Sequence, residues 1–581
     1  MTETLQIPLL DAASARAGDQ AAVAAGDTWA ALMDRAAGHL ARGVVAAGGR
    51  GYGLRVAVLV GKGNNGGDGW AAARRLEREH GARAWVIAPD GVDVEVSAET
   101  EANRAAWRRR GRTSAGTDDL DAALAWCEVA VDCLLGTGVS GAPRGPAGEA
   151  ADALLRAHQR GTIVVACDIP SGVDGDDGKA PDGAVRADVT VTFGGVKRGL
   201  LLHPGAAHAG RVLLGGLGER YDPWTTPEAT TADIDAPDAT DTDTADTADT
   251  TTDTAAADAP DRAPRWVALT PAGAAPGSLT ADAEKRSRGV VLVVAGAVGT
   301  GGAAALAADG ALRAGAGLVT IATPEPVRIE VASRADAGVM VQGVTADEHG
   351  ALAADAVYAL PELAGIDVVA AGPGLGHGQG TAAVVAHLRA HARKLVLDAD
   401  AINVHRDDPS ALAEHAGELV LTPHERELAR MGGGEDGPDA WANRVERVPR
   451  LARELRATIV AKGPGTLVAA PDGRVWVTPV GSAALGSGGT GDALTGIIAA
   501  AIAGADDVPL AVAKAVWWHA AAGELAGRGR ADRATATDLL RTLPATLADL
   551  AAASAVAGGP GERRRPRPGT LAWDDWRQGL G

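Results

Sequence analysis

A turn rich in glycine and asparagine follows an apolar run near the N-terminus of the chain. The nine residues from position 61 read GKGNNGGDG, and the first six match the GxGxxG pattern that binds dinucleotide pyrophosphates. A carboxylate, Asp68, stands where we expect the next helix to begin, and there it would cap the helix and repel a phosphate. The amides of Asn64 and Asn65 instead indicate recognition of a polar ligand or of a cation. The alternative is a glycine-rich turn that only caps a helix.

Two later loops also carry carboxylates directly after apolar runs. Asp132 lies in VDCLLGTG, and Asp168 lies in DIPSGVDG together with Ser171 and Asp174. Because the carboxyl ends of parallel strands meet at one edge of a sheet, we expect these carboxylates to share a crevice with Asn65. Such oxygen ligands would hold a hard cation and leave one carboxylate for acid–base chemistry. For Asp132 the alternative is capping of a turn.

A third motif, GSGGTGDALTG, opens an apolar helix near the C-terminus. Its glycines would let backbone N–H groups approach an anion, and the helix dipole would stabilise negative charge there. Asp492 beside such an anion hole can take a proton from a substrate hydroxyl during phosphoryl transfer. A P-loop sequence is absent from the chain, so we do not expect a P-loop enzyme. A capped, buried helix is the alternative.

These motifs require elements that alternate between strand and helix. Runs such as RVAVLV at 55–60 alternate with helical patterns such as the one at 69–81, and the same rhythm returns from GVVLVVAG at 289–296 onward. Alternation of this kind predicts two α/β units, each with a parallel sheet covered on both faces. Lys197, which follows one of the predicted strands, is either a solvated loop charge or a functional group.

An acidic segment of low complexity divides the chain. Residues 225–264 carry about half of the net charge of -19 and almost no large apolar side chains, so burial cannot offset the entropy of ordering them. We expect an N-terminal domain, an acidic linker, a second domain and a tail rich in proline and arginine, at residues 1–220, 221–265, 266–556 and 557–581.

The composition excludes several classes of protein. A net charge of -19 over 581 residues argues against a nucleic-acid-binding surface, which needs a basic face. The three cysteines show no metal spacing and argue against a disulfide framework. No apolar run reaches the roughly 18 residues of a membrane span, and the N-terminus lacks the basic region of a signal peptide. We therefore expect a cytoplasmic protein without nucleic-acid or membrane partners.

The N-terminal motifs together resemble a known family. GNNGGDG, VDCLLGTG, DIPSGVDGD and VTFGGVKRG, in this order, look like the NAD(P)H-hydrate epimerase domain, which has a Rossmann-like three-layer fold. The resemblance implies that hydrated NADH or NADPH is a substrate and not a redox cofactor. It implies that Asp168 is the acid–base residue, and that Asn65, Asp132 and the backbone oxygen of Ser171 hold a potassium ion. The substrate contacts that it implies are Asn64, Asn65, Gly66, Gly67, Asp68, Gly136, Thr137, Gly138, Val139, Ser140, Gly141, Ala142 and Asp168.

The C-terminal motifs resemble a second family. The glycine-rich turn with Asp492 is similar to the ribokinase-like α/β/α fold, in which the aspartate is the base for phosphoryl transfer to an alcohol. The ordered motifs AAGPGLGHG, VLDADAINV, LTPHERELARM and AKGPGTLVAAPDG look like the ADP/ATP-dependent NAD(P)H-hydrate dehydratase family. This resemblance implies a magnesium ion with ADP or ATP. It implies hydrate contacts at Ala303, Gly374, His424 and Asp492, and adenine-nucleotide contacts at Lys462, Gly463, Pro464, Gly465, Thr466 and Gly491.

Some positions depart from the dehydratase pattern. The family usually has Ser at the position of Ala297, Tyr at that of Thr300 and Asn at that of Ser482. Contacts with the substrate near these positions are therefore in question, whereas the phosphate-binding turn is intact. For His424 the alternative is a turn cap, and we expect Glu427 to be its structural partner.

The two resemblances imply a bifunctional repair enzyme. The N-terminal epimerase would equilibrate the R and S hydrates, and the C-terminal dehydratase would convert the S form back to NADH or NADPH, in a homo-oligomer with at least the size of a tetramer. Two alternatives stay open. One is a ribokinase-like kinase of a small alcohol such as a hydroxymethylpyrimidine, and the other is an N-terminal unit that is a non-catalytic binding module.

Overall fold

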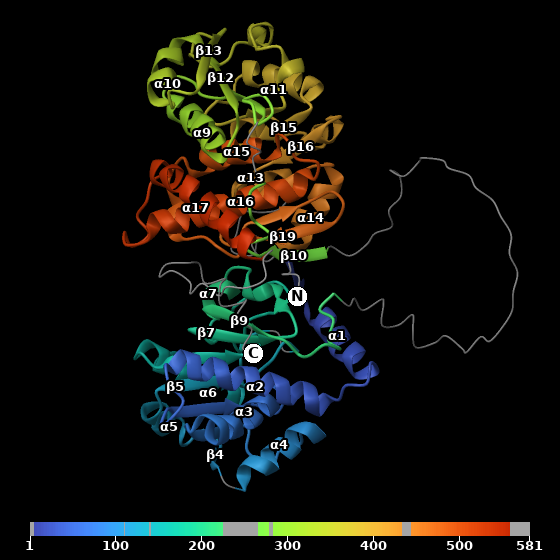
Figure 1. Ribbon diagram of the computed structural model, residues 1–581, viewed down its shortest axis with the longest axis vertical. Coiled ribbons are helices and arrows are strands. Elements are labelled where there is room, and N and C mark those ends of the chain that lie inside the picture. Colours follow the sequence, from blue (N-terminus) through green and yellow to red (C-terminus); the bar gives the residue numbers. More distant parts are fainter. Residues whose placement is uncertain are drawn as a thin grey trace, which may run out of the picture. The chain divides into compact units, whose positions relative to one another are not determined.

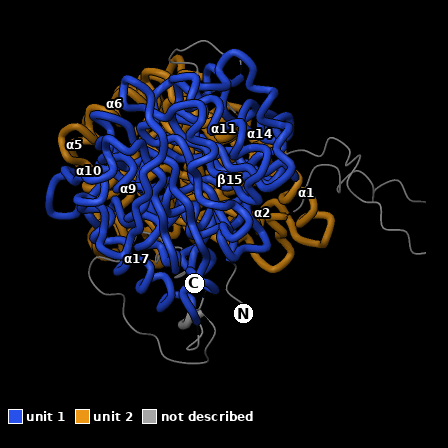
Figure 2. The backbone as a smooth tube through the Cα atoms, turned by 90° about the horizontal axis from the view of Figure 1, so that it is seen from above, with its two compact units in different colours: residues 1–7, 265–567 blue, residues 8–264, 568–581 orange. Residues whose placement is uncertain are grey.

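The computed structural model divides the chain into two compact α/β units (Figures 1 and 2). One unit comprises residues 8–264 and 568–581, and the other comprises residues 1–7 and 265–567. No helix among the described residues is long and apolar enough to cross a membrane. Most of the predicted linker and nearly all of the predicted tail lie outside the described residues, which are 5–109, 111–138, 141–224, 265–277, 283–432 and 443–557.

The N-terminal unit is built on a seven-stranded sheet in which all neighbouring strands are parallel. The strand order reverses between β2 and β5, as in doubly wound folds, so the topological switch point lies beyond the carboxyl ends of these two strands. The sequence predicts five of these strands, and β2 has the bounds expected from RVAVLV. In spatial order the strands are β4 (Arg112–Ala115), β3 (Arg83–Ala88), β2 (Arg55–Val60), β5 (Val129–Cys133), β6 (Ile163–Cys167), β7 (Val189–Phe193) and β9 (Arg211–Gly215).

Helices cover both faces of this sheet, as predicted. Val56 and Val58 of β2 belong to one core, together with buried residues of the first three helices. Ala57 and Leu59 belong to a second core with buried residues of α5 and α6. Because successive strand residues point to opposite faces, the two cores lie on opposite sides of the sheet. The remaining elements are β1 (Gln6–Leu10), α1 (Ala12–Ala24), α2 (Trp29–Gly48), α3 (Asn64–His80), α4 (Ala98–Arg108), α5 (Leu120–Trp126), α6 (Gly145–Gln159), β8 (Val196–Lys197), η1 (Arg198–Leu200) and α7 (Gly205–Ala209).

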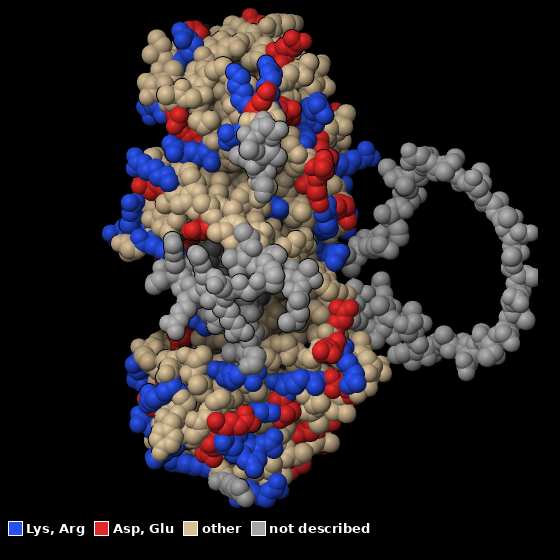
Figure 3. Space-filling view, viewed as in Figure 1, with Lys and Arg blue, Asp and Glu red and all other residues tan. Residues whose placement is uncertain are grey.

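Acidic and basic side chains are interleaved on the visible surface of this unit (Figure 3). On the adjoining helices α2 and α3, for example, Arg75 lies 2.6 Å from Asp34 and 2.7 Å from Glu79. Exposed pairs of this kind contribute little to stability. They balance charge locally on a chain that is acidic as a whole.

The C-terminal unit has a larger sheet of mixed direction. Its first seven strands are parallel, whereas β18 is antiparallel to both of its neighbours. The sequence predicts six of the parallel strands but not this short antiparallel addition. In spatial order these strands are β13 (Met340–Val344), β12 (Leu318–Pro324), β11 (Val290–Val294), β14 (Val368–Ala371), β15 (Lys394–Leu397), β16 (Glu418–Leu421), β17 (Thr458–Ala461), β18 (Leu467–Ala469), β19 (Arg474–Val477) and β10 (Arg265–Leu269).

Close packing of α9 (Gly301–Ala314) on α15 (Thr490–Ile502) positions the glycine-rich motif. A Cβ atom on Gly310 would lie 2.4 Å from the carbonyl oxygen of Ala493, and one on Gly496 would lie 1.7 Å from that of Ala307. Only glycine allows this approach, so α15 lies directly against α9. The other helices are η2 (Glu325–Val327), α10 (Arg328–Arg334), η3 (Ala354–Tyr358), η4 (Leu363–Gly365), α11 (Gln379–His391), α12 (Asp400–Asn403), η5 (Pro409–Glu414), α13 (Glu425–Met431), α14 (Arg444–Glu454), η7 (Ala483–Gly486), α16 (Val508–Gly527) and α17 (Ala536–Ala557).

Candidate active sites

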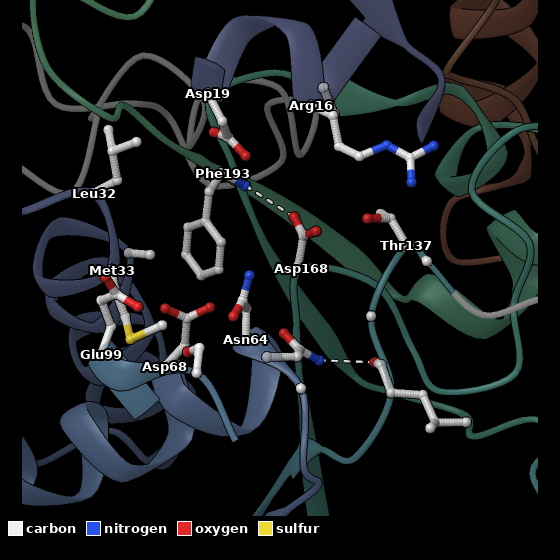
Figure 4. A pocket seen from close by; sticks show the side chains of 18 of the residues that line it. Arg16, Asp19, Leu32, Met33, Asn64, Asp68, Glu99, Thr137, Asp168 and Phe193 are labelled. Carbon is white, nitrogen blue, oxygen red and sulfur yellow. Dashed lines mark hydrogen bonds between the residues drawn. The ribbon is translucent and has the colours of Figure 1, made fainter. Parts of the chain in front are cut away.

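A cavity of about 770 Å³ opens in the N-terminal unit (Figure 4). Its wall is formed by α1, α2, the start of α3 and the loops after β5, β6 and β7. Gly66 and Gly67, which lie in α3, do not line the cavity. Gly141 and Ala142, which lie in the loop after β5, do not line it either. Val139 and Ser140 lie outside the described residues. The predicted site residues that line it are Asn64, Asn65, Asp68, Gly136, Thr137, Gly138 and Asp168.

Glycines bring the ends of β2 and β5 together at this cavity. A Cβ atom on Gly61 would lie 1.9 Å from the carbonyl oxygen of Leu134, and one on Gly66 would lie 1.9 Å from that of Gly61. These close approaches leave no room for a side chain at either position, and α3 begins at Asn64. The prediction that Asp68 caps this helix is wrong, because Asp68 belongs to its second turn and lines the cavity.

Asn65, Asp132 and Ser171 meet around the loop that follows β5. Nδ2 of Asn65 donates to the carbonyl oxygen of Leu135 at 2.7 Å, and Oγ of Ser171 accepts from the amide of the same residue at 2.9 Å. Ser171 donates to the two carboxylate oxygens of Asp132 through Oγ (2.6 Å) and its amide (2.8 Å). Asp132 is fully buried, and burial raises the pKa of its carboxyl although these hydrogen bonds oppose the rise. A buried carboxylate with only neutral partners among the described residues fits a bound cation.

Asp168 and Lys197 form an ion pair at the cavity. Nζ of Lys197 lies 2.5 Å from Oδ1 of Asp168 and 2.9 Å from the carbonyl oxygen of Phe193. Asp168 has a φ of 63°, a left-handed conformation that is rare for residues other than glycine and marks functional sites. Lys197 is only 4% exposed, so it is not a solvated loop charge.

Two more carboxylates, Asp19 of α1 and Asp68 of α3, line the same cavity (Figure 4). Burial raises the pKa of Asp68 well above its usual range, and the charges of Asp168 and Asp19 add to the effect. Burial also raises the pKa of Asp19 to about 6, against the opposing charge of Lys197. Sequence reasoning missed Asp19 because α1 precedes the first motif and carries no motif of its own.

In the C-terminal unit, Asp492 lies in the first turn of α15. Gly489 is the N-cap of this helix with a φ of 86°, and a Cβ atom there would lie 2.5 Å from the side chain of Leu306. Burial raises the pKa of Asp492 to about 6, with Asp398 adding to the rise and Lys462 opposing it. A carboxylate whose pKa lies near neutral pH, at the N-terminal end of a helix where N–H groups lack helical partners, suits a general base.

Lys462 is held by a buried carboxylate that sequence reasoning did not single out. Its Nζ lies 2.6 Å from Oδ1 of Asp398, which also accepts from Oγ1 of Thr422 at 2.8 Å. The other oxygen of Asp398 accepts from Oγ1 of Thr495 in α15, again at 2.8 Å. Nζ of Lys462 is also 3.5 Å from the position that a Cβ on Gly491 would take. The ammonium group therefore lies next to the start of α15.

The predicted nucleotide loop after β17 is closed by hydrogen bonds. Oγ1 of Thr466 donates to the carbonyl oxygen of Gly463 at 2.8 Å. Nη2 of Arg444 donates to the carbonyl oxygens of Pro464 (2.8 Å) and Gly465 (2.9 Å). Arg444 thereby shapes this loop, although its segment shows no recognisable motif.

His424 begins α13 with a capping box. Its Nδ1 accepts from the amides of Arg426 (3.1 Å) and Glu427 (3.3 Å), and the Glu427 carboxylate accepts from the amide of His424 at 2.9 Å. Nε2 therefore carries the proton and lies 3.3 Å from Oε1 of Glu427. His424 therefore caps α13 with Glu427 as its structural partner, and contact of His424 with the hydrate stays a prediction.

Thr300 joins two loops at the switch point of the second sheet. Its Oγ1 donates to the carbonyl oxygen of Gly374 at 2.7 Å and accepts from the amide of Ala297 at 3.1 Å. Ala303 follows in the first turn of α9. The threonine thus ties the predicted hydrate contacts Ala303 and Gly374 together, whereas Ser482 caps η7.

Comparisons with known proteins agree for both units. A family model described as NAD(P)H-hydrate dehydratase matches residues 291–545, and one described as YjeF-related protein N-terminus matches residues 29–199. The bifunctional NAD(P)H-hydrate repair enzymes Nnr of Moorella thermoacetica and Gloeobacter violaceus are each 34% identical to this chain. The first alignment covers 85% of this chain and 88% of that relative, and the second covers 89% and 93%.

Solved structures include an ADP/ATP-dependent NAD(P)H-hydrate dehydratase from Bacillus subtilis co-crystallized with ATP/Mg2+. It is 30% identical, covers 48% of this chain and 95% of its own, and has a TM-score of 0.39. The fold and the family models define a two-unit α/β enzyme. The chain belongs to the family of bifunctional NAD(P)H-hydrate repair enzymes, which confirms the resemblances and the expected fold class.

Proposed function

We propose that this chain repairs hydrated NADH and NADPH in two steps. The N-terminal domain, residues 1–220, interconverts the R and S hydrates. The C-terminal domain, residues 266–556, uses ADP or ATP to convert the S hydrate back to the reduced dinucleotide. The linker (221–265), the tail (557–581), the cytoplasmic location and a homo-oligomer of at least four subunits remain predictions.

Epimerisation inverts the ring carbon that bears the hydroxyl. Water that adds to the enamine bond of a dihydropyridine places its hydroxyl on the carbon next to the ring nitrogen, because the nitrogen stabilises positive charge there. Asp168 is the acid–base residue for this hydroxyl, because its carboxylate borders the cavity. Within the described part of the chain, Lys197 contacts only Oδ1 of this carboxylate, so Oδ2 is available to the substrate. Asn64, at the start of α3, and Thr137, in the loop after β5, line the same cavity and would orient the nicotinamide.

Potassium fits the pocket of Asn65, Asp132 and Ser171. The support is the fully buried carboxylate of Asp132, whose partners among the described residues are neutral donors. The side-chain oxygens of Asn65 and Asp132 and the backbone oxygen of Ser171 would hold the ion. The bound ion would supply positive charge at the loop that carries Gly136 to Gly138.

Dehydration proceeds by phosphorylation of the ring hydroxyl and loss of phosphate. Asp492 takes the hydroxyl proton while the terminal phosphoryl group of the nucleotide moves to that oxygen. The N–H groups at the start of α15 and the ammonium of Lys462 stabilise the phosphoryl charge. The ring nitrogen then expels phosphate, and loss of a proton from the neighbouring carbon restores the dihydropyridine. The loop from Gly463 to Thr466 binds the nucleotide.

Magnesium would accompany the nucleotide and neutralise phosphate charge. The carboxylates Asp398 and Asp492 lie within electrostatic reach of each other, with Asp400 nearby, so the site can accept a cation that arrives with the nucleotide. We assign no protein ligand to this ion.

One observation carries the proposal: each unit holds a carboxylate at its predicted site, Asp168 at the N-terminal cavity and Asp492 in the first turn of α15. The test is recovery of the reduced-nicotinamide absorbance from NADH hydrate of mixed epimers, with ADP or ATP, magnesium and potassium. Wild type should recover the whole signal, Asp492→Ala none of it, and Asp168→Ala only the S fraction quickly. If the reduced-nicotinamide absorbance does not recover in wild type with nucleotide, the proposal is wrong and a kinase of a small alcohol is favoured.

A further inference from the structure

The proposed chemistry gives no role to Asp19, one of the carboxylates that line the N-terminal cavity. Asp19 lines this cavity, is only partly exposed, and has neither a hydrogen-bond nor an ion-pair partner among the described residues. Figure 4 shows the carboxylates of Asp19, Asp68 and Asp168 turned toward the same space, beside the ring of Phe193. A partly buried carboxylate without a partner costs stability, so its presence beside the reactive centre calls for a function.

The position of Asp19 is set by the packing of α1. Asp11 caps this helix and lies 3.4 Å from Arg198, and the amide of Ala12 donates to Asp176 at 2.7 Å. A Cβ atom on Gly18, the residue before Asp19, would lie 2.8 Å from the ring of Tyr221. The helix therefore has little freedom to rotate, and Asp19 stays directed at the cavity.

We infer that Asp19 is a second catalytic residue of the N-terminal site and acts as the general acid opposite Asp168. This inference rests on the proposed epimerase function. The carbon that bears the hydroxyl also bears the ring nitrogen, so the hydrate is a carbinolamine. It can invert by opening and reclosing its ring, as hemiacetals do when they exchange anomers.

The proton transfers balance within one cycle. The Asp168 carboxylate takes the hydroxyl proton, the carbon–oxygen bond becomes a carbonyl, and the carbon–nitrogen bond breaks with its electron pair going to nitrogen. The nitrogen receives the proton of the Asp19 carboxyl. After the aldehyde rotates, the nitrogen adds to its other face, Asp19 recovers its proton from nitrogen, and Asp168 returns its proton to oxygen.

The charges around Asp19 suit it to this exchange. Lys197 and Arg16 are the cations at this part of the cavity wall, Asp168 and Asp68 are the anions, and Tyr221 adds a neutral phenol. Burial and the charge of Asp168 raise the pKa of Asp19 to about 6, against the opposing charge of Lys197, whose Nζ lies 2.5 Å from Asp168. A carboxyl group with a raised pKa, opposite a carboxyl group that contacts a lysine, is the arrangement expected of an acid–base pair.

The test measures conversion of purified R hydrate to S hydrate by the full-length chain without ADP or ATP, so that dehydration is idle. Rates are recorded between about pH 5 and pH 8, a range that spans the titration of Asp19. The variants are Asp19→Asn, Asp19→Glu and, as a matched control, Asp118→Asn, which changes an exposed carboxylate outside the cavity. Dehydration of S hydrate with ADP and the thermal unfolding of each variant serve as checks of folding.

We expect Asp19→Asn to lower kcat for epimerisation about 100-fold with KM nearly unchanged, and to abolish the decline of the wild-type rate above pH 6. Asp19→Glu should retain that decline and part of the rate, and Asp118→Asn should match wild type. A rate for Asp19→Asn within about threefold of wild type, a change in KM alone, or a wild-type profile without this decline would overturn the inference. Absence of epimerisation in wild type above the spontaneous rate would instead overturn the proposed function.

Discussion

Nζ of Lys462 lies 2.6 Å from Oδ1 of Asp398, and the two residues follow β17 and β15, which β16 separates in one sheet. In the N-terminal unit, Lys197 makes the same contact with Asp168 at 2.5 Å. The two ion pairs differ in which partner can contact a ligand. Both oxygens of Asp398 are engaged, so the lysine is the group presented to a ligand, whereas Asp168 itself borders the cavity.

Asp398→Asn should weaken nucleotide binding by about tenfold or more. The substitution leaves Lys462 without its anion, and breaking a buried charge pair is costly because the remaining charge is uncompensated. Calorimetric titration with ADP and ATP measures the effect, with Asp407→Asn, an exposed carboxylate paired with Arg406, as the matched control. Unchanged nucleotide affinity in Asp398→Asn would show that Lys462 does not need this partner.

Asp492→Asn should abolish dehydration and stabilise the protein at neutral pH. Since burial raises the pKa of Asp492 to about 6, the folded state binds its proton more tightly than the unfolded chain does. Stability from this group is therefore present at low pH and lost as pH rises from about 4 to 6. The neutral amide should gain about 1–2 kcal/mol at pH 7 after a discount for partial exposure. Denaturant unfolding at pH 7 and pH 4 measures this difference, and equal stability at pH 7 would contradict it.

The strands and the loops after them could be predicted from the sequence because their signals are local. Apolar β-branched runs have the period of strands, and carboxylates such as Asp132 and Asp168 stand directly after them. Asp19 as a cavity residue and Asp398 as a partner of Lys462 could not be predicted in the same way. Asp19 reaches its cavity only through the packing of α1, and Asp398 becomes a partner of Lys462 only when β15 and β17 join the same sheet.

The start of the helix in the glycine-rich segment at residues 61–69 could not be predicted from local sequence either. Five glycines within nine residues indicate a loop, and this placed the expected helix start at Asp68. The helix begins at Asn64 because close packing needs glycine inside its first turns, where a Cβ on Gly69 would lie 2.8 Å from Val60. Tertiary packing overrides helix propensity here.

Asp132→Asn should remove the potassium dependence of epimerisation together with most of the activity. The buried carboxylate is the only charged group in the proposed ion pocket, and an amide would attract the ion far less. Epimerisation rates in potassium, sodium and tetramethylammonium salts measure the effect in wild type and variant. Asp174→Asn, a change in the loop after Ser171 outside the pocket, is the control. Equal wild-type rates in all three salts would contradict a potassium site.

His519→Gln should make the stability of the C-terminal unit less sensitive to acid. His519 is buried, its Nε2 contacts the carbonyl oxygen of Thr490 at 2.9 Å, and burial lowers its pKa to about 4. The folded state therefore favours the neutral ring, so stability is full above the unfolded pKa of about 6.5 and is lost as pH falls toward 4. The loss in wild type should reach about 2–3 kcal/mol over this window.

Glutamine at position 519 can keep a hydrogen bond to Thr490 but does not titrate, so its unfolding free energy should change less between pH 6.5 and pH 4. Chemical denaturation followed by tryptophan fluorescence measures the slope, since Trp517 and Trp518 lie in the same helix. The matched control His349→Gln changes an exposed histidine and should keep the wild-type slope. Equal slopes for His519→Gln and wild type would mean that the buried ring accepts its proton without cost, and that the start of α15 does not depend on a neutral His519.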